Sequence, residues 1–338
     1  MKNKIILLVD DGFFGQSYNT WKSIDVEKVQ NSFCDSNFEV DILSISDVNN
    51  ADLLISDSYV VYSGSVLPEV GDYIKDALRY LDKNNVLIPS YDHCMCLENK
   101  GFQEIFKKVN DVHTLKANYY SSLKEVDFKA ISYPLVMKRV DGAGSKYVEL
   151  IKSKFELVWS YIKMKGILHF ALYELLLIRK FFLVNTSDYQ EYKRYHFPRM
   201  RFVLQEFVEG LAYDYKALVF GEKIFLLKRS IRKDDFRASG SGKFEFVSEV
   251  SDGLLEYIYS TYKSFNCPCV SLDIVECKDN FGLIEFQFLH FGPYTLQKSD
   301  GYFVKHDGVW KYNQSPESIL EEEFSSSYLS YILEHFEA

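Results

Sequence analysis

Residues 269–289, CVSLDIVECKDNFGLIEFQFL, are the stretch that decides the fold expected for this chain. Two apolar runs flank a short polar segment, and this arrangement predicts an antiparallel hairpin. In the second run Glu285 and Gln287 are two residues apart, so both side chains point to one face of the strand. Asp273 interrupts the first run, which is otherwise apolar. The hairpin therefore places polar side chains within strands that are mostly apolar.

The oxygen atoms of these three side chains favour a cation site. A carboxylate within a half-buried strand is costly unless it is paired or coordinates a cation. Mg²⁺ prefers oxygen ligands and takes its remaining ligands from water and phosphate groups. Asp273, Glu285 and Gln287 are therefore predicted to bind a divalent metal ion. The alternative interpretation is a polar stripe that faces solvent.

The length and composition of the chain limit the remaining choices. A chain of 338 residues is too long for one small domain and predicts two or three packed units. Hydrophobic residues make up 47% of it, which is enough for real cores and excludes wholesale disorder. The net charge of −9 argues against a general nucleic-acid binder, because neutralising phosphates requires a basic surface.

The cysteines and the first residues predict a cytoplasmic protein. The start MKNKIILLVDDG has a short apolar run followed by acidic residues and shows no cleavage signal. No pair of cysteines has the CxxC spacing of a structural zinc site, so we expect free thiols in a reducing compartment. The six cysteines are Cys34, Cys94, Cys96, Cys267, Cys269 and Cys277.

Residues 165–184, KGILHFALYELLLIRKFFLV, form the most apolar segment. His169, Glu174, Arg179 and Lys180 interrupt it, so it lacks the run of about 18 uncharged residues that a membrane span needs. The pattern favours a largely buried or interfacial helix. A helix lying on a membrane surface is the less favoured alternative.

Short apolar runs alternate with a helical pattern in the first part of the chain. The runs are KIILLV at 4–9, FEVDIL at 38–43, ADLLIS at 51–56, YVVYSG at 59–64 and NVLIPS at 85–90. Between the last two, LPEVGDYIKDALRYLDKN has helical periodicity. This alternation predicts an open α/β sheet over residues 1–95.

Helices and antiparallel hairpins are expected in the rest of the chain. Residues 98–109, the segment FELVWSYIKM, residues 165–184 and residues 253–265 have helical patterns. YPLVMKRV at 133–140 and the following KYVELI predict two strands joined by the loop DGAGSK at 141–146. DYKALVFGEKIFLLKRSI predicts a second hairpin, which turns at Gly221–Glu222.

Two flexible loops carry candidate phosphate-binding groups. In DGAGSK the residues Gly142, Gly144 and Ser145 let backbone N–H groups approach an anion, although such a loop is often only a turn. In KDDFRASGSGKFEF at 233–246, Gly242–Lys243 suggests a Walker loop, but Arg237 stands where that loop needs glycine. Arg237 beside a bendable backbone therefore needs another explanation. Surface pairing with a neighbouring aspartate is the simplest alternative.

The order of these features resembles the ATP-grasp superfamily. A basic strand, a Gly-rich loop, the segment QEFVEG at 205–210, an arginine-bearing loop and an acidic hairpin follow one another along residues 96–295. In style, DDFRASGSG and the acidic hairpin are most similar to ribosomal-protein glutamate ligases and glutathione synthetases. The resemblance implies an ATP-grasp fold of two α+β lobes, preceded by an open α/β domain. The expected boundaries are 1–95, 96–204 and 205–338.

The resemblance also implies a nucleotide site. Lys100 and Lys138 match lysines that contact the nucleotide phosphates, the Gly-rich loop would close over them, and residues 205–208 would meet the adenine edge. Asp214 falls near the expected ribose, and Lys228 or Arg229 matches a basic strand that faces the phosphates. The residues assigned to the nucleotide are Lys100, Lys138, Gly142, Gly144, Ser145, Gln205, Glu206, Phe207, Val208, Asp214 and Lys228.

Metal binding and catalysis complete what the resemblance implies. Asp273, Glu285 and Gln287 fall on the positions of the metal ligands, although the third ligand is usually asparagine in that superfamily. Arg229 and Arg237 are the expected catalytic groups, because a guanidinium stabilises charge spread over phosphoryl oxygens. His290 and Tyr294, just past the hairpin, are weaker candidates for the acceptor site.

The expected activity is an ATP- and Mg²⁺-dependent ligase that releases ADP and phosphate. Mn²⁺ is the alternative metal. Such an enzyme joins a carboxylate to an amine or thiol through an acyl phosphate, so it needs no protein nucleophile. The expected partners are small-molecule carboxylate and amine substrates, with a peptide or a surface-glycan precursor as further candidates. No nucleic acid and no membrane association are expected.

Two alternative functions stay open from the sequence. The first is a small-molecule kinase that uses the same nucleotide site without a later acceptor step. The second is a nucleotide-binding protein without activity, which is motivated by Gln287 in place of asparagine. The sequence predicts neither the identity of the substrates nor the oligomeric state.

Overall fold

The structure is a computed structural model that describes residues 3–50, 54–142, 146–182, 185–231, 236–237, 243–277, 280–315 and 318–336. The chain forms two compact units. Unit 1 consists of Met1–Leu97, Phe106–Thr114 and Leu211–Ala338, and unit 2 consists of Glu98–Ile105 and Leu115–Gly210. The division into three parts expected from the sequence is finer and stays a prediction.

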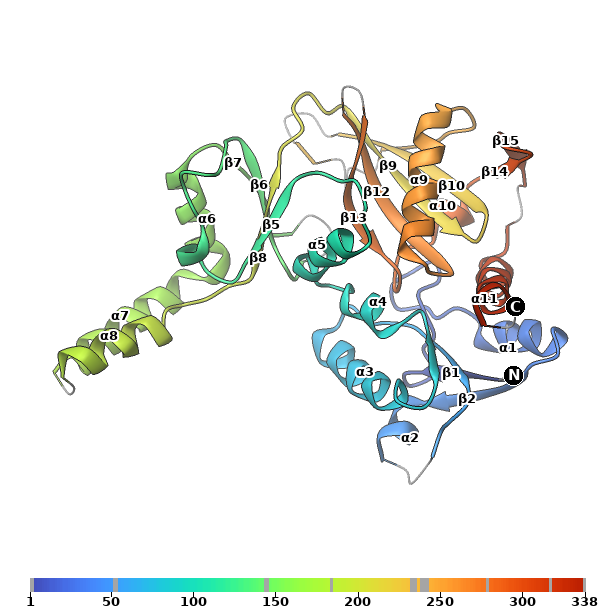
Figure 1. The fold of residues 1–338 in the computed structure, drawn as a ribbon, viewed down its shortest axis with the longest axis horizontal. Helices are drawn as coiled ribbons and strands as arrows, with labels where there is room; N and C mark the ends of the chain where they lie inside the picture. Colours follow the sequence, from blue (N-terminus) through green and yellow to red (C-terminus); the bar gives the residue numbers. More distant parts are fainter. Residues whose placement is uncertain are drawn as a thin grey trace. The chain divides into compact units, whose positions relative to one another are not determined.

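A four-stranded parallel sheet forms the first part of unit 1, as the alternating pattern predicts. Its strand order is β2-β1-β3-β4. Figure 1 shows α1 on one side of this sheet and α3 on the other. The strands are β1 (Lys4–Val9), β2 (Glu39–Ser44), β3 (Tyr59–Tyr62) and β4 (Val86–Ile88), and the helices are α1 (Val26–Asp35), α2 (Ile45–Asn50), α3 (Pro68–Leu81) and α4 (Tyr91–Met95).

The described part of one apolar run of this region is not in a strand. Of the run at 51–56, residues 51–53 lie outside the described residues, and residues 54–56 are not part of any strand. Parallel strands are buried on both faces, and β1 and β3 show this pattern with nearly every side chain buried. Leu54, by contrast, is exposed.

A seven-stranded antiparallel sheet forms the rest of unit 1. Six strands follow the order β13-β12-β9-β10-β14-β15, and β11 also pairs with β10. The two hairpins predicted at 214–231 and 269–289 are present as β9–β10 and β12–β13. The strands are β9 (Tyr213–Phe220), β10 (Lys223–Ser230), β11 (Phe244–Phe246), β12 (Cys269–Cys277), β13 (Asn280–Gln287), β14 (Gly301–His306) and β15 (Val309–Gln314).

Unit 1 has a core that includes side chains of both of its sheets. Ile5 and Leu7 of β1 cluster with Leu218 and Phe220 of β9 and with α11, all of them buried. The helices of this part are α9 (Asp252–Phe265), α10 (Tyr294–Gln297) and α11 (Leu320–Phe336). The end of β9 that carries Leu218 and Phe220 is therefore buried within unit 1.

Unit 2 is built on a four-stranded antiparallel sheet with the order β5-β8-β6-β7. Helix α6 covers one face, where Leu157 and Tyr161 pack against Met137 and Phe202. The strands are β5 (Ala117–Tyr120), β6 (Leu135–Arg139), β7 (Val148–Ile151) and β8 (Phe202–Glu206). The helices are α6 (Lys154–Lys165), α7 (Ile167–Phe181) and α8 (Thr186–Tyr195), with the 3₁₀ turn Leu123–Glu125; α5 (Lys100–Val109) begins in this unit.

Helix α7 departs from the sequence prediction. It forms over the predicted segment, but only Tyr173 and Leu177 are buried in it. Its other large apolar side chains are mostly exposed, so of the two expected alternatives, a largely buried or an interfacial helix, the first was wrong and the second stays a prediction. Apolar composition alone cannot reveal whether a neighbouring element covers a helix. Among the residues that the structure describes, no helix is long and apolar enough to cross a membrane.

Candidate functional site

One face of the antiparallel sheet in unit 1 gathers charged side chains from four strands. In the strand register Glu285 lies opposite Asp273, and Asp273 lies opposite Lys216. Asp214 lies opposite Arg229 and is two residues from Lys216. Side chains directly opposite one another, or two apart on a strand, share a face. These five residues, Asp214, Lys216, Arg229, Asp273 and Glu285, are called the charged cluster below.

Arg229 joins the two aspartates of the charged cluster. Its Nε and Nη2 atoms donate to the two carboxylate oxygens of Asp214, each over 2.7 Å. Nη2 also lies 2.9 Å from Oδ2 of Asp273. Asp214 and Arg229 are buried, while Asp273 is partly exposed. A planar guanidinium is suited to this arrangement because its donors form a rigid fork.

Burial and neighbouring charges shift the pKa values of three of these groups. Burial raises the pKa of Asp214 to about 6, against the opposite effect of Arg229. Burial likewise lowers the pKa of Lys216, while the nearby Asp273 opposes this shift. For Arg229 burial acts downward, but Asp273 and Asp214 outweigh it and raise the pKa above its ordinary value. Arg229 therefore stays cationic, and the cluster combines fixed positive charge with carboxylates in a confined place.

The predicted metal ligands lie on the same face as the charged cluster. Glu285 is directly opposite Asp273, and Gln287 is opposite Ser271, two residues further along each strand. Opposite Cβ atoms in such pairs are about 5 Å apart, so a cation can reach both carboxylates. Among the described residues no three His, Cys, Asp or Glu side chains converge on a metal position. The set fits Mg²⁺ with two carboxylates and an amide oxygen, which leaves positions for phosphate oxygens.

Lys228 does not join the charged cluster. It follows Leu227 and precedes Arg229 on β10, so its side chain leaves the opposite face of the sheet. Its Nζ atom lies 4.0 Å from the ring centroid of Tyr213. Of Lys228 and Arg229, the structure brings only Arg229 to Asp214 and Asp273.

The sheet of unit 2 places Lys138 and Gln205 on one face. Lys138 lies opposite Val203 on β8, and Gln205 lies opposite Val136 on β6. Both side chains are buried. The Nε2 atom of Gln205 is buried without a hydrogen-bond partner among the described residues. An unsatisfied buried amide donor is costly, so it marks a place where a ligand acceptor would be favoured.

Lys100 lies at the start of α5 and contacts the predicted phosphate loop. Its Nζ atom donates to the carbonyl oxygen of Gly142 over 2.6 Å. A Cβ atom on Gly142 would lie 2.7 Å from the carbonyl oxygen of Lys146, so only glycine fits there. A Cβ atom on Gly101 would meet the ring of Tyr119 on β5, so glycine is also required for this approach of helix to sheet.

The structure describes some of the remaining predicted site residues but not all of them. Glu206 is exposed, and its Oε1 atom accepts from the backbone N–H of Lys116 over 2.8 Å. Phe207 and Val208 follow β8 and are partly exposed. Gly144 and Ser145 lie outside the described residues. Arg237 is partly exposed with its guanidinium 5.5 Å from the ring centroid of Phe236, and its predicted catalytic role stays a prediction.

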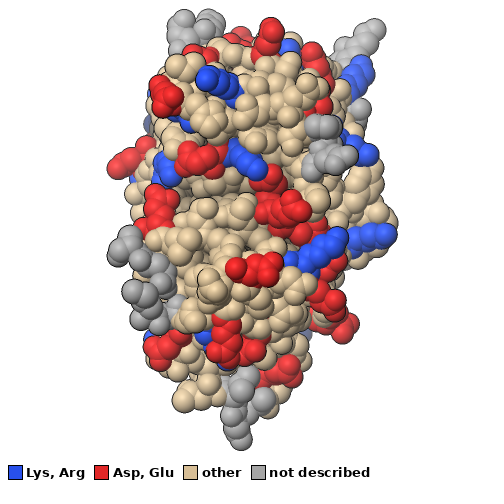
Figure 2. Space-filling model, turned by 90° about the vertical axis from the view of Figure 1, so that its right-hand side faces the viewer, with Lys and Arg blue, Asp and Glu red and all other residues tan. Residues whose placement is uncertain are grey.

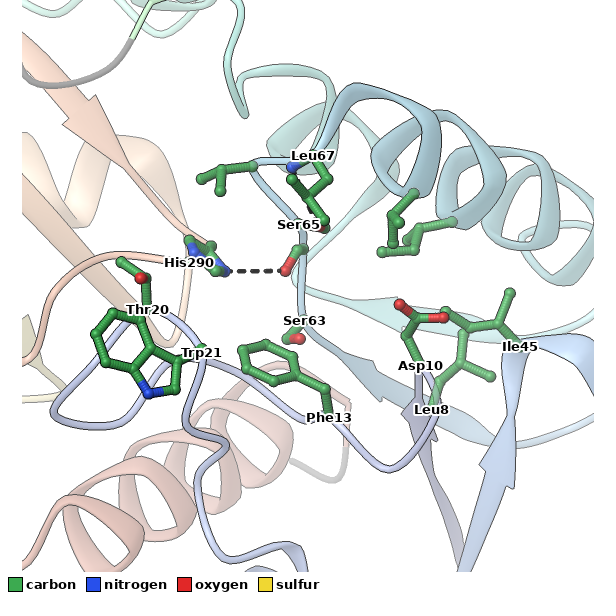
Figure 3. A pocket seen from close by; sticks show the side chains of 14 residues that line it. Leu8, Asp10, Phe13, Thr20, Trp21, Ile45, Ser63, Ser65, Leu67 and His290 are labelled. Atoms are coloured by element: carbon green, nitrogen blue, oxygen red, sulfur yellow. Dashed lines mark hydrogen bonds between the residues drawn. The ribbon is translucent and has the colours of Figure 1, made fainter.

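Unit 1 also contains a pocket at the carboxyl ends of β1 and β3. Its volume is about 320 Å³. Strand β2 lies on one side of β1 and β3 on the other, and ligands of open α/β sheets bind at such switch points. Figure 3 shows Asp10 toward one end of the pocket and His290 toward the other, with Phe13 and Ser63 between them.

His290 contributes an unused hydrogen-bond acceptor to this pocket. Its Nδ1 atom donates to the carbonyl oxygen of Gly64 over 3.3 Å, and burial lowers the pKa of its imidazole. The neutral ring then has Nε2 as an acceptor, and this atom is buried without a partner among the described residues. Gly64 permits the contact because a Cβ atom there would meet Leu97 and come within 3.3 Å of Leu289.

Asp10 was not identified from the sequence. The turn Asp11–Gly12 has positive φ at both residues and joins Asp10 to Phe13 by two backbone hydrogen bonds. This is the geometry of a tight turn that an Asp-Gly pair favours. The signal was therefore present in DDGF, directly after the first buried strand.

The surface agrees with the acidic composition. Figure 2 shows Asp and Glu side chains spread over the face that it draws, with basic side chains interspersed among them. The chain has a net charge of −9. On the face that Figure 2 draws, the described basic side chains do not form the continuous stripe that is typical of a nucleic-acid-binding protein.

Comparison with known proteins identifies the fold. Neither a known protein-family profile nor a curated protein sequence matches the chain. Solved structures do match. D-cycloserine synthetase DcsG is 9% identical with a TM-score of 0.54, and the match covers 97% of this chain and 99% of that one. The RimK domain ATP-grasp protein from Sphaerobacter thermophilus is 10% identical with a TM-score of 0.52, covering 87% and 94%.

A third structure extends this similarity. The ATP-grasp ligase PsnB, in complex with a minimal precursor, is 11% identical with a TM-score of 0.52, and the match covers 98% of this chain and 100% of that one. At such low identity the matches establish the fold alone. The chain has the ATP-grasp fold, as the order of its sequence motifs implied.

Proposed function

We propose that the protein is an ATP- and Mg²⁺-dependent ligase that joins a carboxylate to an amine or a thiol. The charged cluster of unit 1 is the observation that carries this proposal. It provides a fixed guanidinium and adjacent carboxylates on one sheet face, in a chain with the ATP-grasp fold. Such a set suits the transfer of a highly charged phosphoryl group, in which positioning and electrostatics supply most of the catalysis.

Each unit contains residues that the resemblance assigns to the nucleotide. In unit 2, Lys100, Lys138 and the loop that begins at Gly142 would contact the phosphates, since they provide ammonium groups and backbone donors. Residues 205–208 would meet the adenine edge, and the unsatisfied amide of Gln205 supports a hydrogen bond to the ligand. Asp214 would lie near the ribose, and Arg229 and Arg237 would contact the transferred phosphoryl group.

Asp273, Glu285 and Gln287 would hold Mg²⁺, or Mn²⁺ as the alternative. The metal would neutralise charge on the phosphate oxygens. In the reaction, a carboxylate oxygen attacks the γ-phosphorus and ADP leaves. The amine or thiol then attacks the carbon of the acyl phosphate, phosphate leaves, and the nucleophile loses a proton.

The pocket at the carboxyl ends of β1 and β3 supports an amine as one substrate. Asp10 supplies a carboxylate, His290 supplies a neutral nitrogen acceptor, and no Lys or Arg is among the described residues that line the pocket. These groups accept hydrogen bonds, so they favour a ligand that donates them. The volume of about 320 Å³ suits a small molecule or one residue of a larger one.

None of the six cysteines, all of which lie among the described residues, forms a disulfide, and this supports the proposed reducing, cytoplasmic location. A peptide or a surface-glycan precursor stays a candidate for the larger substrate. Neither the pocket nor the charged cluster restricts the size or chemistry of the part of that substrate that lies outside them.

Phosphate release from ATP in the presence of carboxylate and amine libraries tests the proposed activity. Release that requires both substrates is the expected result. Asp273→Asn and Glu285→Gln should each lower turnover at least a hundredfold, whereas Glu276→Gln, an exposed position on the same strand as Asp273, should leave it unchanged. A stable phosphorylated product from a single substrate would establish a kinase. ATP binding without any turnover would establish a non-catalytic nucleotide-binding protein.

The amine pocket has a separate test. Asp10→Asn should raise KM for the amine at least tenfold and leave the Kd for ATP unchanged. Asp11→Asn is the matched control, because Asp11 is exposed in the adjoining turn and asparagine tolerates its positive φ. Equal KM values for the two variants would remove Asp10 from the substrate site.

A further inference from the structure

Helix α7 of unit 2 exposes an unusual amount of apolar surface. Figure 1 shows α7 and α8 side by side as a helical hairpin that extends from the sheet of this unit. Eight large apolar side chains of α7 and its C-terminal cap are between 44 and 79% exposed. They are Ile167, Leu168, Leu172, Leu175, Leu176, Ile178, Phe181 and Phe182. Large contiguous apolar patches on soluble proteins mark interaction sites.

The exposed side chains are not left over from packing within the hairpin. The inner side of α7 is already used: Tyr173 and Leu177 are buried, and the hydroxyl of Tyr173 donates to the carbonyl oxygen of Lys193 on α8 over 2.9 Å. On the outer side, Leu168, Leu172 and Leu175 are spaced by four and three residues and so form one stripe. Helix α7 thus has apolar side chains on both sides, and the stripe of Leu168, Leu172 and Leu175 is not covered by α8.

The charge of this region differs in sign from that of the whole protein. Residues 163–201 contain eight Lys or Arg and three Asp or Glu, a net charge of +5 in a chain of −9. Lys163 and Lys165 precede the helix, and Arg179 and Lys180 lie in its last turn. An apolar stripe flanked by basic residues is the pattern of a helix that lies in the headgroup region of a membrane.

We propose that the α7–α8 hairpin docks the protein on the surface of an anionic lipid bilayer. Charge complementarity favours this occupant over a second copy of the chain, because two hairpins would bring like charges together. The helix does not span: its 15 residues are about 22 Å long, shorter than the hydrocarbon core of about 30 Å. The apolar stripe enters the headgroup boundary, and the Lys and Arg side chains contact lipid phosphates.

Flotation of the full-length protein with vesicles tests the proposal. Vesicles of phosphatidylcholine alone are compared with vesicles of equal parts phosphatidylcholine and phosphatidylglycerol. The protein should float with the anionic vesicles and stay behind with the neutral ones. Leu168→Gln, Leu172→Gln and Leu175→Gln together should lower the bound fraction at least tenfold. Arg179→Gln should lower the partition coefficient roughly fivefold, and added salt should weaken the binding of the wild type.

A matched control distinguishes binding through α7 from nonspecific binding by other exposed apolar side chains. Leu54→Gln, Val309→Gln and Leu333→Gln together remove as many exposed apolar side chains from unit 1 and should leave flotation unchanged. Urea midpoints confirm that both triple variants are folded. Two results would overturn the proposal. One is a wild-type protein that does not float with anionic vesicles. The other is an α7 triple variant that floats with anionic vesicles as the wild type does, while sedimentation velocity shows that the wild type is a dimer and the variant a monomer.

Discussion

The buried histidine His93 should make the stability of the protein fall on acidification. This residue lies on α4 and is only 5% exposed. Its Nε2 atom donates to the carbonyl oxygen of Phe265 over 2.8 Å, and its Nδ1 atom accepts from the hydroxyl of Ser90 over 2.7 Å. The ring packs against Phe288, with the centroids 4.4 Å apart. The neutral imidazole is therefore fully hydrogen-bonded within unit 1, and a second proton has no place to bind.

The size of the effect follows from the pKa of His93. Burial lowers this pKa to about 4, although the carbonyl oxygen of Phe265 and the charge of Asp92 act in the opposite direction. In the unfolded chain the pKa of histidine is about 6.5. The folded state thus binds fewer protons than the unfolded state. The contribution of neutral His93 to the free energy of unfolding is complete above pH 6.5 and is lost as the pH falls toward 4. The loss is about 2 kcal/mol between pH 7.5 and 5, and about 3 kcal/mol in full.

Urea unfolding of wild type and His93→Gln at pH 7.5, 6 and 5 measures this contribution. Glutamine does not titrate and its amide can donate to the same carbonyl oxygen, so the variant should lose about 2 kcal/mol less than the wild type over this range. His113→Gln is the control, because His113 is exposed, and it should follow the wild type. Equal pH dependence of wild type and His93→Gln would refute the reasoning.

Further predictions concern the two units and the loop between β10 and β11. Gly101→Ala should lower the free energy of unfolding by about 1–3 kcal/mol, because its Cβ would meet the ring of Tyr119, whereas Gly253→Ala in α9 has room and should not. Arg229→Lys keeps the charge but loses the fork between two aspartates, so we expect a stability loss of about 1–3 kcal/mol in urea unfolding and at least tenfold lower turnover. Arg237→Ala should reduce kcat by orders of magnitude with little change in the Kd for ATP; equal losses in both would indicate a ground-state contact.

Much of the fold could be predicted because its elements carry strong local patterns. The hairpins β9–β10 and β12–β13 and the helix α9 lie where the sequence placed them. Other elements were not predicted although a signal was present. The hairpin β14–β15 turns at Asp307–Gly308, both with positive φ, and an Asp-Gly pair between two apolar runs is a strong hairpin signal. Strand β5 has only four residues and depends on pairing with β8, so no local pattern announces it.

Some residues of the site could likewise be predicted from the sequence, whereas others could be identified only from the structure. The polar positions Asp273, Glu285 and Gln287 stand out within apolar strands, so the sequence alone marks them. The strand register was needed to tell which of Lys228 and Arg229 shares a face with Asp214, because neighbouring residues on a strand face opposite sides. Asp10 and His290 are 280 positions apart in the sequence, and only the folded chain places both beside one pocket.

The order of motifs along the chain was enough to predict the ATP-grasp fold and the strands that carry the charged cluster. These features could be predicted because side-chain periodicity is visible within a short segment, and so is a charged residue that would be costly to bury unpaired. The tertiary structure decided which charges meet, and it left the apolar stripe of α7 uncovered. Contacts between distant segments and the coverage of a helix depend on how elements pack, and that information is not local in the sequence.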